Sequence, residues 1–174
     1  MKQIEQKNYG SALYTLVMVF FFCGFLGASN GIFIPFCKTH FHLTQFESQL
    51  VDSAFYGAYF IGSLVLYLIS TGVGYDILNK IGFKNGIVYG LIVSVVGAFC
   101  MIPAVNSGEY MLILGSFFVI ALGFSLQQTA ANPFAIALGD PATGAHRLSL
   151  AGGVNSFGTM VGPIIVTIVL FGTI

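Results

Sequence analysis

Five long stretches of this chain of 174 residues contain no Asp, Glu, Lys or Arg, and the charged residues gather in short segments between them. The stretches hold 30 residues (8–37), 23 (53–75), 24 (85–108), 30 (110–139) and 27 (148–174). A helix needs about 20 mainly apolar residues to cross a bilayer, so each stretch is long enough. The pattern predicts five transmembrane helices, at approximately residues 11–36, 45–72, 85–103, 110–138 and 147–171.

The stretches do not alternate apolar and polar residues, as the strands of a membrane barrel would. Composition agrees with helices in lipid, because 56% of the residues are hydrophobic and only 7% are charged. The first stretch follows Lys2 and Lys7 like a signal peptide, but its apolar part is too long and no cleavage site ends it. We therefore expect an all-α membrane protein, with one transmembrane domain over residues 1–174 and a retained first helix.

The basic residues lie unevenly on the two sides that these helices define. Lys2, Lys7, Lys80, Lys84 and Arg147 fall on one side, and Lys38 alone falls on the other. By the positive-inside rule the N-terminus is cytoplasmic and the end of this chain is external. The net charge of zero gives no indication of a nucleic-acid partner.

Polar residues form a stripe on the fourth predicted helix. Ser125, Gln128, Thr129 and Asn132 share one face at spacings of three, four and seven, and Gln127 is adjacent. In a membrane such a face must meet other helices or an aqueous cavity. Both interpretations stay open: hydrogen bonds between helices, or a site for an uncharged, hydroxylated ligand such as a sugar.

Prolines near matching ends of the first and fourth helices favour the second interpretation. Pro35 is expected to end the first helix, and Asn132-Pro133 is expected to interrupt the fourth. These two helices would be equivalent members of two inverted three-helix repeats. Broken helices at equivalent positions indicate the binding site of a transporter.

Asp52 is the carboxylate placed most clearly inside a predicted helix. Thr44 and Glu47 form a T-x-x-E capping box, so the second helix begins near Thr44 and Asp52 lies about 12 Å along it. An ionisable residue inside a membrane is a functional candidate, although one this near the surface can also be hydrated. Gly24, Gly27, Ala28 and Gly31 form a smooth face on the first helix, suited to close backbone approach.

Motifs of enzymes are absent from the sequence. We find no phosphate loop, no metal-ligand cluster and no nucleophile with a base, so neither catalysis nor a cofactor is expected. Cys23, Cys37 and Cys100 lack metal-site spacing and are expected to be packed thiols.

Three strings resemble a known family. They are Gly57-Ala58-Tyr59-Phe60, the LQQTAANPF string at 126–134, and Arg147-Leu148 continuing to Asn155-Ser156-Phe157-Gly158. Together with residues 35–44 they resemble the fucose-galactose-glucose:proton symporters of the major facilitator superfamily, in order and over nearly the whole chain. The resemblance implies a sugar transporter that works by alternating access in the plasma membrane, the bacterial inner membrane.

The resemblance also implies roles for single residues. Substrate contacts are expected from five amide side chains: Asn30, Gln127, Gln128, Asn132 and Asn155. The hairpin with Asp76, Lys80, Gly82 and Lys84 resembles a degenerate form of the superfamily's cytoplasmic gating motif.

This sequence departs from the family at the carboxylates that the family links to proton coupling. Gly31 and Gln128 stand at those positions, and neither can bind and release a proton. A glutamine of the family is replaced by Gly152. Coupling has moved to Asp52, uses another ion, or is lost, and we favour the move to Asp52.

The resulting hypothesis is cation-coupled transport of a neutral hexose or deoxyhexose, with a proton or sodium as coupling ion. Its partners are the sugar, the bilayer and a remaining transporter half or oligomeric partner, because family members have about twelve helices in two halves. The alternatives are an uncoupled sugar facilitator and a non-transporting membrane subunit.

Overall fold

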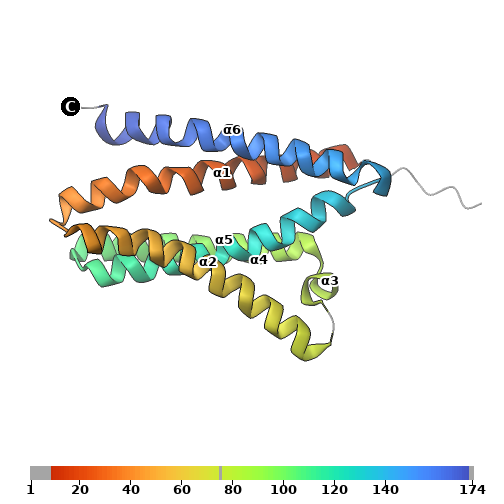
Figure 1. The fold of residues 1–174 in the computed structure, drawn as a ribbon, viewed down its shortest axis with the longest axis horizontal. Helices are drawn as coiled ribbons and strands as arrows, with labels where there is room; N and C mark the ends of the chain where they lie inside the picture. The colour runs from red at the N-terminus through yellow and green to blue at the C-terminus, as the bar shows by residue number, and fades with distance from the viewer. Residues whose placement is uncertain (1–8, 75, 173–174) are drawn as a thin grey trace, which may run out of the picture. The chain divides into compact units, whose positions relative to one another are not determined.

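The computed structural model describes residues 9–74 and 76–172, and in this part of the chain the regular secondary structure is helical. Its elements are α1 (Tyr9–His40), α2 (Gln45–Val73), α3 (Ile77–Ile81), α4 (Phe83–Ser107), α5 (Tyr110–Ala137), the short 3-10 turn η1 (Pro141–Thr143) and α6 (Gly144–Phe171). Figure 1 labels α1 to α6 and colours them in chain order. Five are long and apolar enough to cross a membrane, namely α1, α2, α4, α5 and α6. The predicted helical class with five spans is confirmed. Lys2 and Lys7, used above for orientation, lie outside the described residues.

The prolines do not interrupt their helices. α1 continues through Pro35 to His40, beyond the expected end at residue 36. α4 continues through Pro103 to Ser107, and α5 continues through Pro133 to Ala137. The predicted interruption of the first and fourth spans is therefore wrong. Proline removes one backbone donor, but membrane helices tolerate this loss where neighbouring groups and local adjustments satisfy the freed backbone.

The predicted start of α2 is confirmed in detail. The Glu47 backbone N–H donates to Thr44 Oγ1 at 3.3 Å, and the Thr44 backbone N–H donates to Glu47 Oε2 at 2.8 Å. α6 begins at Gly144, about one turn before the expected residue 147. Asp140 accounts for this early start, because its side chain caps the turn at Pro141–Thr143 that leads directly into α6.

The chain packs as two compact units, which are described separately. One consists of residues 1–29 with 132–174, and the other of residues 30–131. α1 passes from one unit to the other between Ser29 and Asn30, and α5 does so between Ala131 and Asn132. We name them the α1–α6 unit and the α2–α4–α5 unit. The single domain expected from the sequence stays a prediction.

In the α1–α6 unit, backbones approach closely across glycines. The first part of α1 runs beside α6 (Figure 1), and a Cβ added at Gly158 would lie 2.2 Å from the Phe21 carbonyl oxygen. A Cβ added at Gly24 would lie 2.0 Å from the Asn155 carbonyl oxygen. A Cβ at Gly27 would meet nothing within 4 Å. The predicted smooth face of α1 is thus used at Gly24 but not at Gly27.

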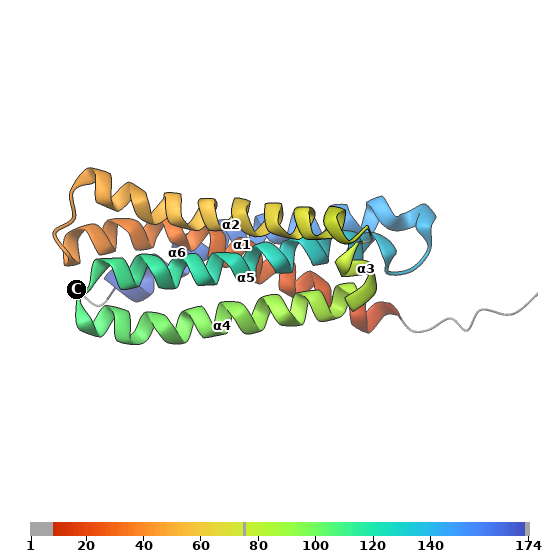
Figure 2. The same cartoon turned by 90° about the horizontal axis from the view of Figure 1, so that it is seen from below.

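In the α2–α4–α5 unit, α4 and α5 run side by side (Figure 2), and they meet in part through glycines. A Cβ at Gly123 would lie 2.5 Å from the Gly90 carbonyl oxygen, and one at Gly97 would lie 2.7 Å from the Ile120 nitrogen. Of the three thiols expected to be packed, Cys100 on α4 is exposed, whereas Cys23 and Cys37 are buried. The expectation is therefore wrong for Cys100.

Candidate substrate and ion site

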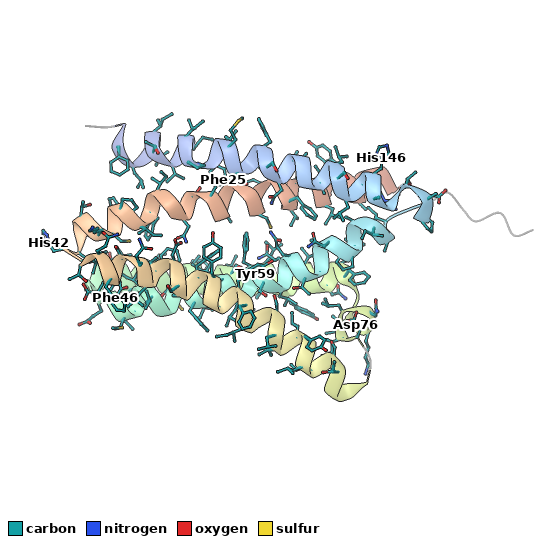
Figure 3. The ribbon with its side chains drawn as sticks, in the orientation of Figure 1. Phe25, His42, Phe46, Tyr59, Asp76 and His146 are labelled. Atoms are coloured by element: carbon teal, nitrogen blue, oxygen red, sulfur yellow. The ribbon has the colours of Figure 1, made fainter. Side chains whose placement is uncertain are left out.

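A line of polar side chains along α2 organises the α2–α4–α5 unit. Asp52, Tyr59 and Ser63 lie at spacings of seven and four, so they share one face of the helix. Asp52 contacts α1, and Tyr59 and Ser63 contact α5. Figure 3 labels Tyr59 on this helix. Of these three residues the sequence pattern singled out Asp52 alone, although the seven-residue spacing from Asp52 to Tyr59 indicated a shared face.

The contact between Asn30 and Asp52 joins α1 to α2 within this unit. Asn30 Nδ2 donates to Asp52 Oδ1 at 3.1 Å. Asn30 is 6% exposed, and its Oδ1 is a buried acceptor without a hydrogen-bond partner. Asp52 is half-buried. A buried polar atom without a partner carries a desolvation cost of about 1–3 kcal/mol, so this one requires an explanation.

Gln128 lies on α5 opposite α2. The Tyr59 hydroxyl donates to Gln128 Oε1 at 3.4 Å, a long hydrogen bond. Ser125, one turn earlier, donates to the Tyr59 carbonyl oxygen at 2.9 Å and lies 2.9 Å from the Ser63 hydroxyl. Gln128 is half-buried, whereas Ser125 is fully buried.

Gln127 faces α4 rather than α2. Its Nε2 donates to Ser94 Oγ at 2.9 Å, and Ser94 donates to the Ile120 carbonyl oxygen at 3.1 Å. The Gln127 residue is 4% exposed. Its amide therefore joins two helices in this conformation, and its predicted contact with substrate stays a prediction.

The polar stripe on α5 divides between the two interpretations left open by the sequence. Ser125 bonds across to α2, and Thr129 donates to the Ser125 carbonyl oxygen of its own helix at 2.8 Å. Asn132, at the end of the stripe, is exposed. The early part of the stripe thus provides a bond between helices, and its last member, Asn132, presents a solvent-accessible amide.

Asn155 belongs to the α1–α6 unit. Its Nδ2 donates to the Phe20 carbonyl oxygen at 2.9 Å, and the residue is half-buried. Gly152, which replaces the family's glutamine, is exposed, and a Cβ there would meet nothing within 4 Å. The face of α6 next to Asn155 is thus open in this unit.

Arg147 closes the connection from α5 to α6 in the same unit. Its guanidinium donates to the carbonyl oxygens of Ala135 at 3.0 Å, Ile136 at 2.7 Å and Asp140 at 3.0 Å, and to Thr143 Oγ1 at 2.6 Å. The last carbonyls of a helix lack partners within it, and a cation is favourable there. Arg147 thereby holds the end of α5 against the start of α6.

The hairpin between α2 and α4 contains the short helix α3, which was not predicted from the sequence. Asp76 caps it, because Asp76 Oδ1 accepts from the Leu78 backbone N–H at 2.9 Å and Oδ2 accepts from Asn79 Nδ2 at 3.2 Å. Figure 3 shows Asp76 beside this helix. Gly82 ends it with φ at +90°, a conformation that favours glycine. Lys80 and Lys84 are exposed. The expected capping role of Asp76 is confirmed, and the gating role of the hairpin stays a prediction.

The opposite end of the α2–α4–α5 unit is joined by Tyr110. Its hydroxyl donates to the Glu47 carbonyl oxygen at 2.5 Å and so ties the start of α5 to the first turn of α2. Within residues 9–74 and 76–172, no group of three or more His, Cys, Asp or Glu side chains is arranged to hold a metal ion.

Comparison with known proteins assigns the chain. The Major Facilitator Superfamily profile matches residues 16–173. A glucose/galactose transporter of Brucella abortus is 43% identical over 92% of this chain and 37% of its own length. A putative glucose/galactose transporter of Helicobacter pylori is 38% identical over 98% of this chain and 40% of its own length. The chain thus spans about two fifths of the length of these relatives.

A solved structure agrees with these matches. The crystal structure of a Major Facilitator Superfamily transporter, FucP, in the outward conformation is 34% identical, with a TM-score of 0.72 over 90% of this chain and 37% of that one. With five helices able to cross a bilayer, the chain is an integral membrane protein. It belongs to the Major Facilitator Superfamily.

Proposed function

We propose that this chain is the N-terminal part of a secondary transporter for a neutral hexose or deoxyhexose, such as glucose, galactose or fucose. The observation that carries the proposal is the 43% identity to a glucose/galactose transporter over 92% of the chain. The uncharged amides described above support it, because an amide offers a donor and an acceptor to a sugar hydroxyl.

The substrate contacts proposed are those the family pattern assigns. They are the side-chain amides of Asn30, Gln127, Gln128, Asn132 and Asn155. Asn132 is the strongest of these candidates, because its side chain is exposed and makes no hydrogen bond in the described chain. Gln127 is the weakest, since Ser94 already holds it.

Alternating access would require further helices. Transporters of this superfamily enclose their path between two halves, and this chain spans about two fifths of its relatives. The proposed partner is therefore the remaining half, either in the same polypeptide or in an associated one. The proposed setting is the bacterial inner membrane, with the N-terminus and the hairpin around Lys80 and Lys84 in the cytoplasm.

Cation coupling is proposed to run through Asp52. This carboxylate lies within a membrane-spanning helix and is held by a buried amide. An intramembrane carboxylate in such a position is a typical element of proton and cation pathways. The second candidate function is an uncoupled facilitator, favoured by Gly31 and Gln128 at the positions where the family's coupling carboxylates are expected.

Reconstituted transport tests both candidates. The complete transporter that contains this sequence is placed in proteoliposomes, and hexose accumulation is measured under an imposed proton or sodium gradient. We expect gradient-driven accumulation in the parent protein and its loss in Asp52→Asn, with sugar exchange retained. The matched control is Ser116→Ala, a buried serine that bonds only to its own helix. Equilibration without accumulation in the parent supports the facilitator, and unchanged accumulation in Asp52→Asn removes Asp52 from the mechanism.

A further inference from the structure

The side chain of Asn30 has one oxygen without a hydrogen-bond partner. Asn30 Oδ1 is buried, accepts no hydrogen bond, and belongs to the same amide whose Nδ2 donates to Asp52. Elsewhere in the unit, the buried Gln127 amide donates to a serine hydroxyl, and Ser125 bonds to two groups on α2. The Asn30 amide is therefore half satisfied at the point where it meets a carboxylate.

A proton on Asp52 would satisfy this oxygen. A carboxylic acid and a primary amide form a ring of two hydrogen bonds, in which the amide N–H donates to the acid carbonyl and the acid O–H donates to the amide oxygen. The first of these bonds is present at 3.1 Å. The second needs a donor, and an ionised carboxylate has none whereas a protonated one has one. We infer that Asp52 and Asn30 form a proton-binding pair, closed as an acid–amide ring when Asp52 is protonated.

The amide orientation does not change this conclusion. The oxygen and nitrogen of an asparagine side chain are assigned from their hydrogen bonds rather than seen directly. If the Asn30 amide were turned over, its oxygen would lie 3.1 Å from the Asp52 oxygen. Two acceptors at that distance repel unless a proton lies between them. Both orientations therefore need a proton on Asp52 to be fully satisfied.

A metal cation fits the same oxygens less well. Hard cations take six or more oxygen ligands, or keep waters to complete their shell. The pair offers Asn30 Oδ1 and one remaining Asp52 oxygen, and among the described residues no group of three His, Cys, Asp or Glu side chains is arranged to hold a metal ion. A proton needs one acceptor and no shell. The inference deepens the proposed function, on which it rests, by naming the coupling ion as a proton.

The basic side chains on this part of α1 have other contacts, because Lys38 donates to Gln45 Oε1 and His40 stacks on Phe36. Among the described residues, no lysine, arginine or histidine bonds to Asp52. The other ionisable side chains on the parts of α1, α2 and α5 in this unit are Cys37, Lys38 and His40 on α1, Glu47, Tyr56, Tyr59 and Tyr67 on α2, and Tyr110 on α5. Glu47 is held by Thr44, and the Tyr110 hydroxyl bonds to the Glu47 backbone. The proton taken up by Asp52 comes from solvent, and no other bond breaks.

Infrared difference spectra of the complete transporter in lipid nanodiscs test the pair directly. On acidification we expect an Asp52 carboxylic-acid C=O band at a hydrogen-bonded frequency, absent in Asp52→Asn and moved toward a free acid in Asn30→Ala. Ser116→Ala should match the parent. With labelled asparagine, the Asn30 amide band should shift with pH in the parent and not in Asp52→Asn, which keeps the test valid if Asn30→Ala does not fold.

Thermal unfolding gives a second measurement. Asp52→Asn can close an amide–amide ring with Asn30 at every pH, whereas the parent closes its ring only when protonated. We expect Asp52→Asn to unfold at or above the temperature of the parent at neutral pH, with the difference closing as the pH falls. Asp52→Leu, which offers no partner to Asn30, should unfold below both. A difference independent of pH would overturn the pair.

The outcomes separate this inference from the proposed function. Absence of the acid band from the parent protein on acidification, or a band at the same frequency in the parent and in Asn30→Ala, refutes the proton pair even if sugar transport is coupled. A band shift driven by sodium at constant pH assigns the two oxygens to a metal cation instead and also refutes it. A clear pair without gradient-driven sugar accumulation refutes the coupled function and leaves the proton-binding pair standing.

Discussion

The two units hold their helices together by different means. In the α1–α6 unit the backbones approach at Gly24, Gly158 and Gly162, and one side-chain amide, Asn155, bonds across to α1. In the α2–α4–α5 unit side chains bond across the α2–α5 contact, through Ser125 and Gln128, in addition to glycine contacts between α4 and α5.

Both solutions are expected in lipid, where helices gain no hydrophobic energy from association and rely on close packing and polar bonds. The difference decides what remains available for a ligand. In the α2–α4–α5 unit Ser125, Gln127 and Gln128 already bond to other helices, whereas the α1–α6 unit keeps an exposed amide at Asn132 and an exposed small-residue face at Gly152 and Gly153. Polar residues in a membrane helix are therefore informative about binding only after those used in packing are subtracted.

Gly158→Ala should have the largest effect, because it attacks the backbone contact on which the α1–α6 unit depends. The new Cβ would lie 2.2 Å from the Phe21 carbonyl oxygen, so the helices must separate. Overpacking of this kind costs about 1–3 kcal/mol. The control on the same helix is Gly153→Ala, where nothing lies within 4 Å. Thermal unfolding in detergent should show a lower unfolding temperature for Gly158→Ala and no decrease for Gly153→Ala. Equal decreases in the two variants would contradict the close contact.

Arg147→Lys should come next, because it tests a charged side chain that holds the α5–α6 connection of the α1–α6 unit together. Lysine cannot reproduce the guanidinium fork that reaches three carbonyl oxygens. We expect a loss of about 1–2 kcal/mol and faster proteolysis at the α5–α6 connection. His146→Gln changes the exposed neighbouring residue and should be neutral. Resistance of the connection to protease in Arg147→Lys would argue against the capping role.

A double-mutant cycle on Ser94 and Gln127 measures the polar contact in the other unit. Combining Ser94→Ala with Gln127→Leu should give a coupling energy of about 0.6 kcal/mol, the average for hydrogen bonds between membrane helices. A parallel cycle that pairs Ser94→Ala with Ser116→Ala should be additive, because the Ser116 hydroxyl bonds within its own helix. Zero coupling in the first cycle would leave the glycines as the main link between α4 and α5.

Tyr110→Phe should have the smallest effect, of about 0.5 kcal/mol, because it removes one bond to the Glu47 carbonyl oxygen at the end of the unit. Tyr56→Phe, at a residue 61% exposed, should change nothing measurable. Chemical denaturation of both variants distinguishes them. If Tyr110→Phe lowered the free energy of unfolding by more than the Ser94–Gln127 coupling energy, the order of these two predicted effects would be reversed.

The sequence was a good guide to elements whose causes are local. The five spans and the cap at Thr44 and Glu47 depend on apolar length and on residues three positions apart, and both were correct. The helix ends predicted at Pro35 and Pro103 were wrong, because whether a proline ends a helix depends on what surrounds the freed backbone groups. The stripe on α5 was recognised as a stripe, but its division among Gln127, Gln128 and Asn132 could not be predicted.

By itself the sequence determined the membrane class, the number of spans and the resemblance to sugar transporters, since apolar length and ordered motifs are properties of the chain. Tertiary structure decided which polar groups meet. It joined Asn30 to Asp52, placed Gln127 against Ser94 and left Asn132 exposed. The physical reason is that a hydrogen bond between helices depends on the register and rotation of two segments far apart in the chain, which the periodicity within each segment does not specify.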